Sequence, residues 1–310
     1  MSATKLKSNL DLICDTDRLP QDVFTLLWTD EDGPYAIGYV LKRVARELDQ
    51  APAELRAGIV IDYDNRTIRL CLGDSTEVER TQMMANLAKY WRDRATFKLL
   101  KTWRNELWPV YDRRGGLLFS MERAAVGLIG AMRYGVHMTA YVEDKTAPHG
   151  IRLWIPKRAA DKSTYPSMLD NTVAGGLMTG EDPFECIIRE ADEEASLPED
   201  VVRNNAVCTG TVTYIDVTEA RHVGEDDYIY PECEWVYDLK LPADVVPQPK
   251  DGEVEEFRLC DVDEVKRDLR LGKFKSNCAL VTIDFFIRHG ILTEENEPDL
   301  ARLGKISGKP

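Results

Sequence analysis

A dense group of acidic residues in the middle of the chain has the residue types of a metal site. From Gly175 onward the sequence reads GGLMTGEDPFECIIREADEEASL, with a single arginine, Arg189. Glu190, Glu193 and Glu194 are spaced as neighbours on one helical face. Like charges at this spacing destabilise a helix, and burial adds to the cost. A hard divalent cation such as Mg²⁺ removes the cost, because it binds carboxylate oxygens and bridges them to substrate phosphates.

The same segment predicts an amphipathic helix that would position those carboxylates. Asp182 and Pro183 are typical of an N-cap and a first helical position, and Glu185 suits the first turn. A stripe of apolar residues predicts the buried face, formed by Phe184, Ile187, Ile188, Ala191 and Ala195. Gly175 and Gly176 allow the backbone to come close to an ion or a phosphate. The alternative interpretation is a solvated acidic helix with an i,i+4 pair between Glu185 and Arg189.

Composition limits the classes of function. The chain has 310 residues and a net charge of −14, which argues against a nucleic-acid-binding protein because phosphate contacts need clustered basic residues. The seven cysteines are scattered without C-x-x-C spacing, which favours a reducing compartment over a disulfide framework. We find no signal-peptide core and no apolar run of membrane-spanning length, so we expect a cytoplasmic protein without membrane contact.

The elements before the acidic segment predict a small α+β domain over residues 1–124. Tyr35 to Gln50 has the apolar spacing of a helix, and Gly58 to Leu72 predicts two strands around a turn at Asp64 and Asn65. A long helix follows, and Thr76 and Glu79 are spaced as a capping box. We find no catalytic constellation in this region.

Residues 125–310 predict a second domain with strands before and after the acidic helix. The segments VHMTAYV, GIRLWIPKR, AVCTGTVTYIDV and ECEWVYDLKLP favour strands, and DVDEVKRDLRLG and ALVTIDFFIRHG favour closing helices. Strands on both sides of a helix indicate a mixed sheet between layers of helices, that is, an α/β/α sandwich.

The spacing of the charged residues resembles the Nudix box. The pattern Gly175-x5-Glu181-x7-Arg189-Glu190-x-x-Glu193-Glu194 matches that box at every charged position. The resemblance implies a hydrolase that cleaves a diphosphate linked to another group. It also implies that Glu190, Glu193 and Glu194, with the Gly175 or Gly176 carbonyl, bind Mg²⁺ or Mn²⁺, and that Arg189 and Glu181 orient these carboxylates.

A narrower resemblance covers nearly the whole chain, most closely from about residue 100 to 290. The segments LWIPKRAADKSTYPSMLDNTVAGG, LPADVVPQPKDGEVEEF and KSNCALVTIDFFIRHG are similar to the thiamine-pyrophosphokinase-related Nudix proteins, and TWRNELWPVYD resembles the end of their N-terminal domain. That group hydrolyses thiamine diphosphate and prefers its oxidised, damaged forms, giving the monophosphate and phosphate. The implied partner is thus a small-molecule diphosphate, and the implied state is a monomer or homodimer.

Four residues depart from the expected family pattern. Ser196 stands where the helix end usually has glycine, and Ala191 stands where a larger aliphatic residue is usual. Ser167 and Ser276 stand where glycine and proline are expected. We expect the first two to affect stability or packing, and the last two to affect substrate preference rather than the class of reaction.

Candidate site residues also lie outside the box. In the segment DGEVEEF, Glu253 follows a glycine turn and is our choice for the general base or a further metal ligand, ahead of Glu255 and Glu256. The alternative for Glu253 is a solvated loop carboxylate. His137, Lys273, Lys275 and Asn277 are candidates for phosphate or ring contacts, against the alternatives of a structural histidine and surface lysines.

An aromatic pair could bind the ring of the substrate. Arg104 and Glu106 lie between Trp103 and Trp108, and an aromatic face suits the stacking of a thiazole or pyrimidine ring. The alternative for both tryptophans is packing in the core.

Three other functions compete with thiamine diphosphate hydrolysis. A Nudix hydrolase of a nucleotide sugar or a dinucleotide would share the same box. An isopentenyl-diphosphate isomerase would need a cysteine in a C-x-H-P setting, which the sequence lacks. A non-enzymatic Nudix module would commonly lose box carboxylates, whereas this sequence keeps all of them.

Overall fold

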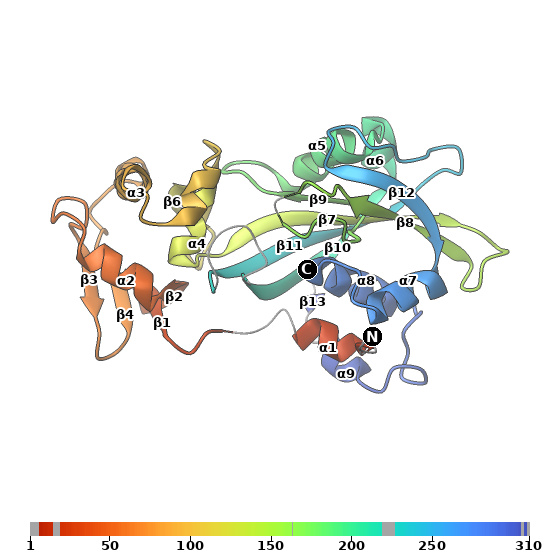
Figure 1. Ribbon diagram of the computed structural model, residues 1–310, viewed down its shortest axis with the longest axis horizontal. Coiled ribbons are helices and arrows are strands. Elements are labelled where there is room, and N and C mark those ends of the chain that lie inside the picture. Colours follow the sequence, from red (N-terminus) through yellow and green to blue (C-terminus); the bar gives the residue numbers. More distant parts are fainter. Residues whose placement is uncertain (1–5, 15–18, 163, 219–226, 305–306, 309–310) are drawn as a thin grey trace.

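The computed structural model describes residues 6–14, 19–162, 164–218, 227–304 and 307–308, and the structural statements below concern those residues. Two sheets lie at opposite ends of an elongated molecule, as Figure 1 shows. No helix in these ranges is long and apolar enough to cross a membrane.

The first sheet has four strands in the order β2-β1-β4-β3. They are β1 (Val23–Asp30), β2 (Gly33–Leu41), β3 (Ile59–Asp62) and β4 (Thr67–Leu70). The strands β3 and β4 are the predicted hairpin around Asp64 and Asn65. Helix α3 (Glu77–Asp93) begins at the predicted capping box, since Thr76 and Glu79 each accept a hydrogen bond from the other's backbone N–H.

The prediction of one helix from Tyr35 to Gln50 is wrong in its first half. Strand β2 runs through Leu41, and helix α2 covers only Lys42–Asp49. An unbroken apolar run fits a buried strand as well as a helix, and antiparallel pairing with β1 decides for the strand. Gly38 is needed in this strand, because a Cβ there would lie 2.4 Å from the Ile129 carbonyl oxygen.

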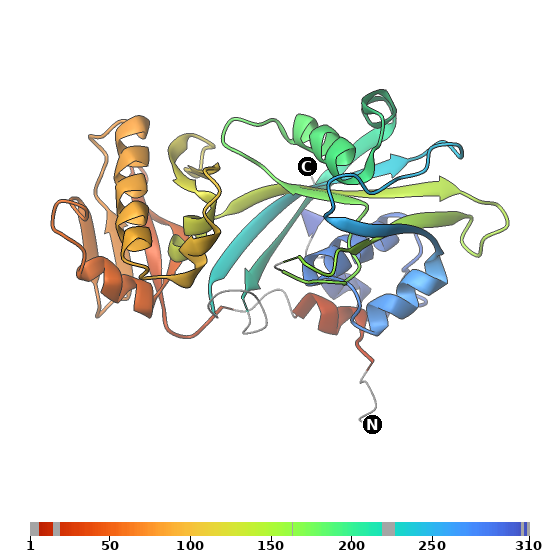
Figure 2. The same ribbon diagram turned by 45° about the horizontal axis from the view of Figure 1, so that its top comes forward.

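A short hairpin and a few short helices link this sheet to the second one. They are η1 (Lys98–Thr102), β5 (Leu107–Tyr111), β6 (Leu117–Glu122), η2 (Arg123–Ala125) and α4 (Val126–Ile129). The strands β5 and β6 form a two-stranded antiparallel sheet of their own in the described part of the chain. This β5–β6 hairpin lies between the two large sheets, as Figure 2 shows.

The second sheet is the predicted mixed sheet. Its order is β12-β8-β7-β11-β10-β13, with β9 paired to β7, and β7 runs parallel to β11. Its strands are β7 (Arg133–Glu143), β8 (Ile151–Arg158), β9 (Val173–Gly176), β10 (Ala206–Val217), β11 (Ile229–Lys240), β12 (Val254–Asp261) and β13 (Ser307–Gly308).

Helices cover both faces of this sheet, which confirms the α/β/α sandwich. One face carries α5 (Pro183–Ala195) and α6 (Glu199–Asn205). The other carries α1 (Asn9–Cys14), α7 (Val262–Arg270), α8 (Ser276–Arg288) and α9 (Leu300–Leu303). The two faces hold separate cores, since Val236 packs with α8 whereas the adjacent Tyr237 packs with α5.

The core of the first region extends beyond the predicted domain boundary. Residues 125–131 contribute apolar side chains to it. Tyr228 and Ile229, at the start of β11, pack in the same core and are 1% and 0% exposed. The boundary between residues 124 and 125 stays a prediction, but the two regions share side chains.

Candidate active site

Helix α5 begins and ends as predicted. Asp182 is the N-cap, and its Oδ1 accepts hydrogen bonds from the backbone N–H groups of Phe184 (2.8 Å) and Glu185 (3.2 Å). Ser196 ends the helix with a left-handed φ of 52°, which explains why glycine is the usual residue there.

The buried face of α5 also follows the predicted stripe. Four predicted residues are buried in the core on this side of the sheet, namely Ile187, Ile188, Ala191 and Ala195. Phe184 is only partly buried and packs near Tyr237, with ring centroids 6.0 Å apart. The stripe omitted Cys186, which is fully buried.

Arg189 gathers the carboxylates of the box. Its Nε and Nη2 donate to Glu181 at 2.9 and 3.2 Å. Its Nη1 donates to Glu190 at 2.8 Å and to Glu193 at 3.0 Å. One guanidinium thus bridges three carboxylates, in charge-assisted hydrogen bonds. Below, the "box cluster" means Glu181, Arg189, Glu190, Glu193 and Glu194.

The alternative pair between Glu185 and Arg189 does not describe this helix. Glu185 accepts from both terminal nitrogens of Arg203, at 2.8 and 2.6 Å. The Arg189 side chain therefore serves the box cluster, and Glu185 ties α5 to α6.

Glu190 lies directly against the backbone of β9. A Cβ built on Gly175 would lie 2.3 Å from Glu190 Oε1, so glycine makes room for the carboxylate. Burial is the largest cause that raises the pKa of Glu190 to about 7. Arg189 opposes this shift, and the charges of Glu193 and Glu181 add to it.

Glu194 reaches the same strand from the last turn of the helix. Its Oε2 accepts a hydrogen bond from Ala174 N at 3.1 Å. Burial, followed by the charges of Glu190 and Asp170, raises its pKa well above the usual value. Two neighbouring carboxyls whose ionisation is disfavoured form an all-oxygen donor set that a hard divalent cation would stabilise.

The predicted metal ligands adjoin one another but do not form a closed ligand set. No three His, Cys, Asp or Glu side chains in the described ranges converge in that way. Arg189 engages one oxygen each of Glu190 and Glu193, and a backbone N–H engages one oxygen of Glu194. The residues fit a divalent cation by chemistry and position, and their assignment as ligands stays a prediction.

Glu253 lies one residue before β12. It is partly buried, whereas Glu255 and Glu256 are exposed. Burial would raise the pKa of Glu253, but an ion pair with Lys162, with help from the charge of Arg158, holds the pKa below its usual value. The charge of Glu253 contributes to the raised pKa of Glu194, so the two carboxyls are electrostatic neighbours.

The predicted ring-binding tryptophans have other contacts. Trp103 is partly buried, and the Arg92 guanidinium lies 4.5 Å from its ring centroid. Trp108 is buried, and both Arg123 and Arg133 lie over its ring, at 4.9 and 4.6 Å from the centroid. Core packing, the alternative, therefore describes Trp108.

Arg104 is exposed, and its charge acts on the predicted base. Its backbone N–H donates to Glu122 Oε1 at 2.9 Å, which fixes the main chain at this point. The Arg104 charge also contributes to the lowered pKa of Glu253. Of the aromatic segment TWRNELW, Arg104 is thus the residue whose charge reaches the site.

His137 is a structural residue on β7. Its side chain is on the α8 side of the sheet, where Nδ1 forms a hydrogen bond with Asn171 Oδ1 at 2.8 Å. His137 is 3% exposed, and burial followed by the charge of Lys275 lowers its pKa to about 4. The ring is therefore neutral at physiological pH.

Lys275 and Asn277 lie at the start of α8, above the α8 face of the sheet. The Lys275 Nζ lies 5.9 Å from the ring centroid of Tyr165, and its charge lowers the pKa of Asp170. Asn277 is buried, and its Nδ2 donates to Tyr214 Oη at 2.8 Å. Lys273 is exposed and pairs with Asp268, as the surface alternative predicts.

A buried polar group on the α8 face was not predicted. It consists of Arg133, Tyr214, Glu232, Glu234 and Asn277 and is called the "sheet cluster" below. The Tyr214 hydroxyl contacts both carboxylates, donating to Glu232 Oε2 and lying 3.1 Å from Glu234 Oε1. Arg133 Nη1 lies 3.2 Å from Glu232 Oε1.

The two carboxyls of the sheet cluster have opposite pKa shifts. Burial, followed by the charge of Glu232, raises the pKa of Glu234 to about 8. Burial would raise the pKa of Glu232, but the charge of Arg133, the hydrogen bond from Tyr214 and the charge of Lys275 together hold the pKa below its usual value. No donor in the described part of the chain reaches Glu234 Oε2, which lies over Gly135 at 2.3 Å from the position of a Cβ.

The sequence of β11 carries a signal for two members of this cluster. Glu232 and Glu234 are two residues apart in a strand that is otherwise largely apolar, so they share one face. Acidic residues at a period of two inside a buried strand rarely occur without a partner. Asp170, which pairs with Arg158 at 2.6 Å beside Lys275, had no comparable signal.

The backbone conformation explains why glycine and proline are expected at two positions where this chain has serine, Ser167 and Ser276. Ser167 has a left-handed φ of 59°, a conformation that glycine adopts at low cost. Ser276 is the first residue of α8, a position that favours proline. Ser276 Oγ also lies 3.4 Å from Tyr165 Oη, so both departures adjoin the start of α8.

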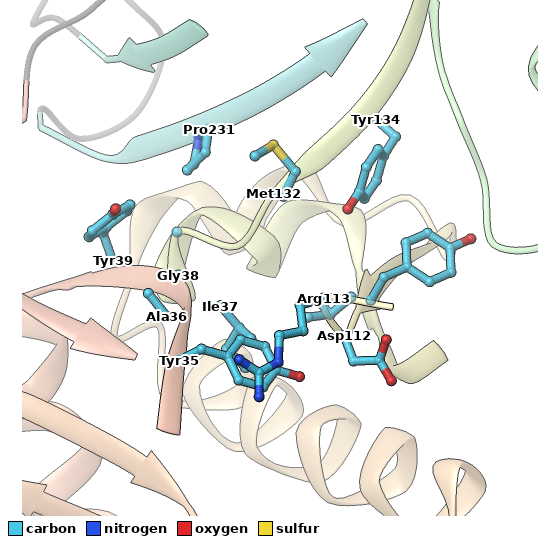
Figure 3. A pocket seen from close by; sticks show the side chains of 13 residues that line it. Tyr35, Ala36, Ile37, Gly38, Tyr39, Asp112, Arg113, Met132, Tyr134 and Pro231 are labelled. Carbon is cyan, nitrogen blue, oxygen red and sulfur yellow. The ribbon is translucent and has the colours of Figure 1, made fainter. Parts of the chain in front are cut away.

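A cavity of about 240 Å³ lies where β2, the end of β5 and the start of β7 meet, as Figure 3 shows. Its walls include Tyr35, Tyr39, Tyr134 and Arg113, and the Arg113 guanidinium lies 4.6 Å from the ring centroid of Tyr35. None of the predicted site residues lines it.

Two family descriptions together match most of the chain. The NUDIX domain matches residues 134–279, and a domain of unknown function, DUF4743, matches residues 33–133. The two matches meet at the first residues of β7.

Three similar proteins share more than a third of their aligned residues with this chain. The uncharacterized protein YJR142W of Saccharomyces cerevisiae is 36% identical over 86% of this chain and 78% of its own length. Nudix hydrolase 20, chloroplastic, of Arabidopsis thaliana is 36% identical over 84% of this chain and 67% of its own. Nudix hydrolase 24, chloroplastic, of the same plant is 38% identical over 70% and 56%.

Proposed function

The chain belongs to the Nudix hydrolase family, and from this premise we propose that it hydrolyses thiamine diphosphate and its oxidised derivatives to the monophosphate and phosphate. Nudix hydrolases are phosphoanhydride hydrolases that act on small diphosphate substrates. The observation that carries the proposed hydrolysis is the box cluster, in which Arg189 gathers three carboxylates beside the bare backbone of Gly175. The choice of thiamine rests on the resemblance of nearly the whole chain to the thiamine-pyrophosphokinase-related group.

The family generally depends on a divalent metal, and we propose Mg²⁺ or Mn²⁺ for this chain. Glu190, Glu193, Glu194 and the Gly175 carbonyl would hold the ion. When bound there, it would neutralise charge on the diphosphate and lower the pKa of a water molecule. The raised pKa values of Glu190 and Glu194 support the assignment, because a cation favours the ionised form of both.

Glu253 is the proposed general base. Lys162 keeps it ionised, and it lies close enough to Glu194 to affect the pKa of that residue. Its carboxylate would accept the proton of the water that attacks phosphorus in line with the leaving oxygen. Arg189 keeps its role of orienting Glu190 and Glu193.

Arg104 and Lys275 are the proposed contacts for phosphate oxygens. The charge of Arg104 lowers the pKa of Glu253, and the charge of Lys275 lowers the pKa of Asp170. Both are cations next to the carboxylates of the site, which suits a diphosphate anion. The other candidates for substrate contacts already have protein partners. His137 is hydrogen-bonded to Asn171, Asn277 is hydrogen-bonded to Tyr214, and the Arg92 guanidinium lies over the Trp103 ring.

The proposed physiological role is removal of damaged thiamine diphosphate, with the oxidised forms as better substrates. Ser167 and Ser276 adjoin Tyr165 and Lys275, so this corner is where substrate preference would differ among relatives. The cytoplasmic location stays a prediction.

The test is release of phosphate, with Mg²⁺, from oxothiamine, oxythiamine and thiamine diphosphates and from a panel that includes ADP-ribose, a nucleotide sugar and NADH. We expect the oxidised thiamine compounds to have the highest kcat/KM. Omission of the metal and the Glu253→Gln variant should each remove most of the turnover.

The matched control is Glu255→Gln, an exposed carboxylate two residues further along the chain that pairs with Lys157 and should retain full activity. Turnover of ADP-ribose or NADH without turnover of any thiamine compound would reject the proposal in favour of a nucleotide-linked substrate.

A further inference from the structure

The loop between β9 and α5 is attached to the β5–β6 hairpin of the N-terminal region. Thr179 makes the attachment, since its backbone N–H donates to the Leu107 carbonyl oxygen at 3.0 Å. Its Oγ1 donates to the same carbonyl at 3.1 Å and lies 3.0 Å from Ser120 Oγ. The hairpin thus provides both a backbone and a side-chain anchor for this loop.

A second contact fixes the strand that enters the loop. The indole of Trp108, on β5, covers Gly176, where a Cβ would lie 2.6 Å from an indole ring carbon. The guanidinium groups of Arg123 and Arg133 both lie over the indole, at 4.9 and 4.6 Å from its ring centroid. Trp108 is 3% exposed, so the ring has little freedom to move away from the glycine.

The loop continues directly into the box cluster. Glu181 follows Thr179 by two residues, and its Oε2 accepts from Met178 N at 3.2 Å. Both oxygens of Glu181 then engage Arg189, which holds Glu190 and Glu193. A displacement of the loop would reach the carboxylates through Glu181 and Arg189.

We infer that the β5–β6 hairpin is a positioning element of the active site, in which Thr179 and Trp108 fix the loop that sets Glu181 and Arg189 against the box carboxylates. This goes beyond the proposed function, because it holds for any diphosphate that the site cleaves. Neither residue touches the reacting atoms. Both act on geometry, where misplacement by about 1 Å can cost a hundredfold in rate.

The experiment compares Thr179→Val with Thr179→Ser in the full chain. Valine keeps the shape of threonine but loses the hydroxyl, and serine keeps the hydroxyl. Thr146→Val is the matched control, because that hydroxyl bonds Asp144 in an exposed turn outside the site. The measurements are kcat and KM, binding of Mn²⁺ by calorimetry, hydrogen exchange of residues 177–182, and Tm.

We expect Thr179→Val to lower kcat about tenfold, to change KM by less than about twofold, and to weaken Mn²⁺ binding several-fold. Exchange of the loop amides should become faster, and Thr179→Ser should restore all of these values. Trp108→Phe, which shortens the ring over Gly176, should shift kcat and loop exchange in the same direction.

A fall in Tm alone, with kcat, Mn²⁺ binding and loop exchange like those of the Thr146→Val control, would overturn the inference. If the wild type cleaves no thiamine compound, the proposed function fails, and the variants are then compared on whichever diphosphate is cleaved. If none is cleaved, faster loop exchange in Thr179→Val that serine reverses supports the inference, and unchanged exchange overturns it.

Discussion

Two groups of glutamates lie near one another in this molecule and differ in almost every physical respect. The box cluster comes from one loop and one helix, and an arginine bonds three of its carboxylates. The sheet cluster comes from three strands and a helix, and its Glu234 is 6% exposed with one oxygen that no described donor reaches. Glu193 of the box cluster is half-exposed, whereas Glu232 and Glu234 of the sheet cluster are buried. We therefore predict that carboxylates of equal chemistry serve reaction in the box cluster and structure in the sheet cluster.

The largest expected effect separates turnover from stability in the box cluster. Replacing Glu194 with Gln should lower kcat by roughly 10²–10³-fold, the range for loss of one placed electrostatic group. Tm should not fall, because Gln removes a carboxyl whose ionisation burial disfavours. The measurements are steady-state kinetics with Mg²⁺ and thermal unfolding.

Asp192→Asn is the control on the same helix, since Asp192 is exposed and forms an ion pair with Lys250 at 2.7 Å, away from the box cluster. Equal kcat for Glu194→Gln and the wild type would mean that the metal site is misassigned.

The sheet cluster should show the opposite behaviour. Replacing Glu232 with Gln leaves Arg133 without its charged partner, so the free energy of unfolding should fall by about 2–4 kcal/mol. Glu193→Gln, in the half-exposed part of the box cluster, should change it by less than about 0.5 kcal/mol. The measurement is urea unfolding of both variants. Equal losses of unfolding free energy would contradict the proposed difference between the two clusters.

The free energy of unfolding should depend on pH through His137, which is buried on the α8 face of the sheet. The pKa of His137 is about 4 in the folded protein and 6.5 when unperturbed, so the unfolded chain binds an extra proton between those values. Stability is therefore lost as pH falls from 6.5 toward 4, by roughly 1.4 kcal/mol per pH unit at most. His137→Gln lacks this contribution.

The measurement is urea unfolding of wild type and His137→Gln at pH 7, 6 and 5. The difference between their free energies of unfolding should shrink as pH falls. A difference that stays constant with pH would show that folding does not lower the pKa of His137.

The smallest effect concerns the left-handed serine near the start of α8. Ser167→Gly should stabilise the protein by about 0.5 kcal/mol, because relief of the left-handed conformation exceeds the added freedom of the unfolded chain. Ser276→Gly, at the first position of a helix, should destabilise it. Thermal unfolding of both variants is the measurement. A lower Tm for Ser167→Gly than for the wild type would contradict the prediction.

The box cluster was predictable because its residues are local in sequence. Spacings of three and four residues place Glu190, Glu193 and Glu194 on one helical face without any tertiary information. The N-cap Asp182 and the left-handed Ser196 are likewise fixed by adjacent residues. The alternation of the strand segments was also sufficient for the mixed sheet.

The sheet cluster and the loop anchors needed tertiary information. Tyr214, Glu232 and Asn277 meet because β10, β11 and α8 pack together, and no local spacing encodes that contact. The helix prediction for Tyr35 to Leu41 is wrong for a related reason, since pairing with β1 decides the conformation of this segment. Thr179 meets the hairpin across 72 residues of sequence.

The shared core at the start of β11 has a consequence for the order in which the molecule folds. Tyr228 and Ile229 pack among side chains from the first 131 residues, and the Arg43 guanidinium lies 4.6 Å from the Tyr228 ring centroid. A ribosome releases that N-terminal region about 100 residues before it releases Ile229. During that interval the region exposes the apolar surface that Tyr228 and Ile229 later cover. The part of the protein that is synthesised first therefore completes its core only with help from a strand of the catalytic half.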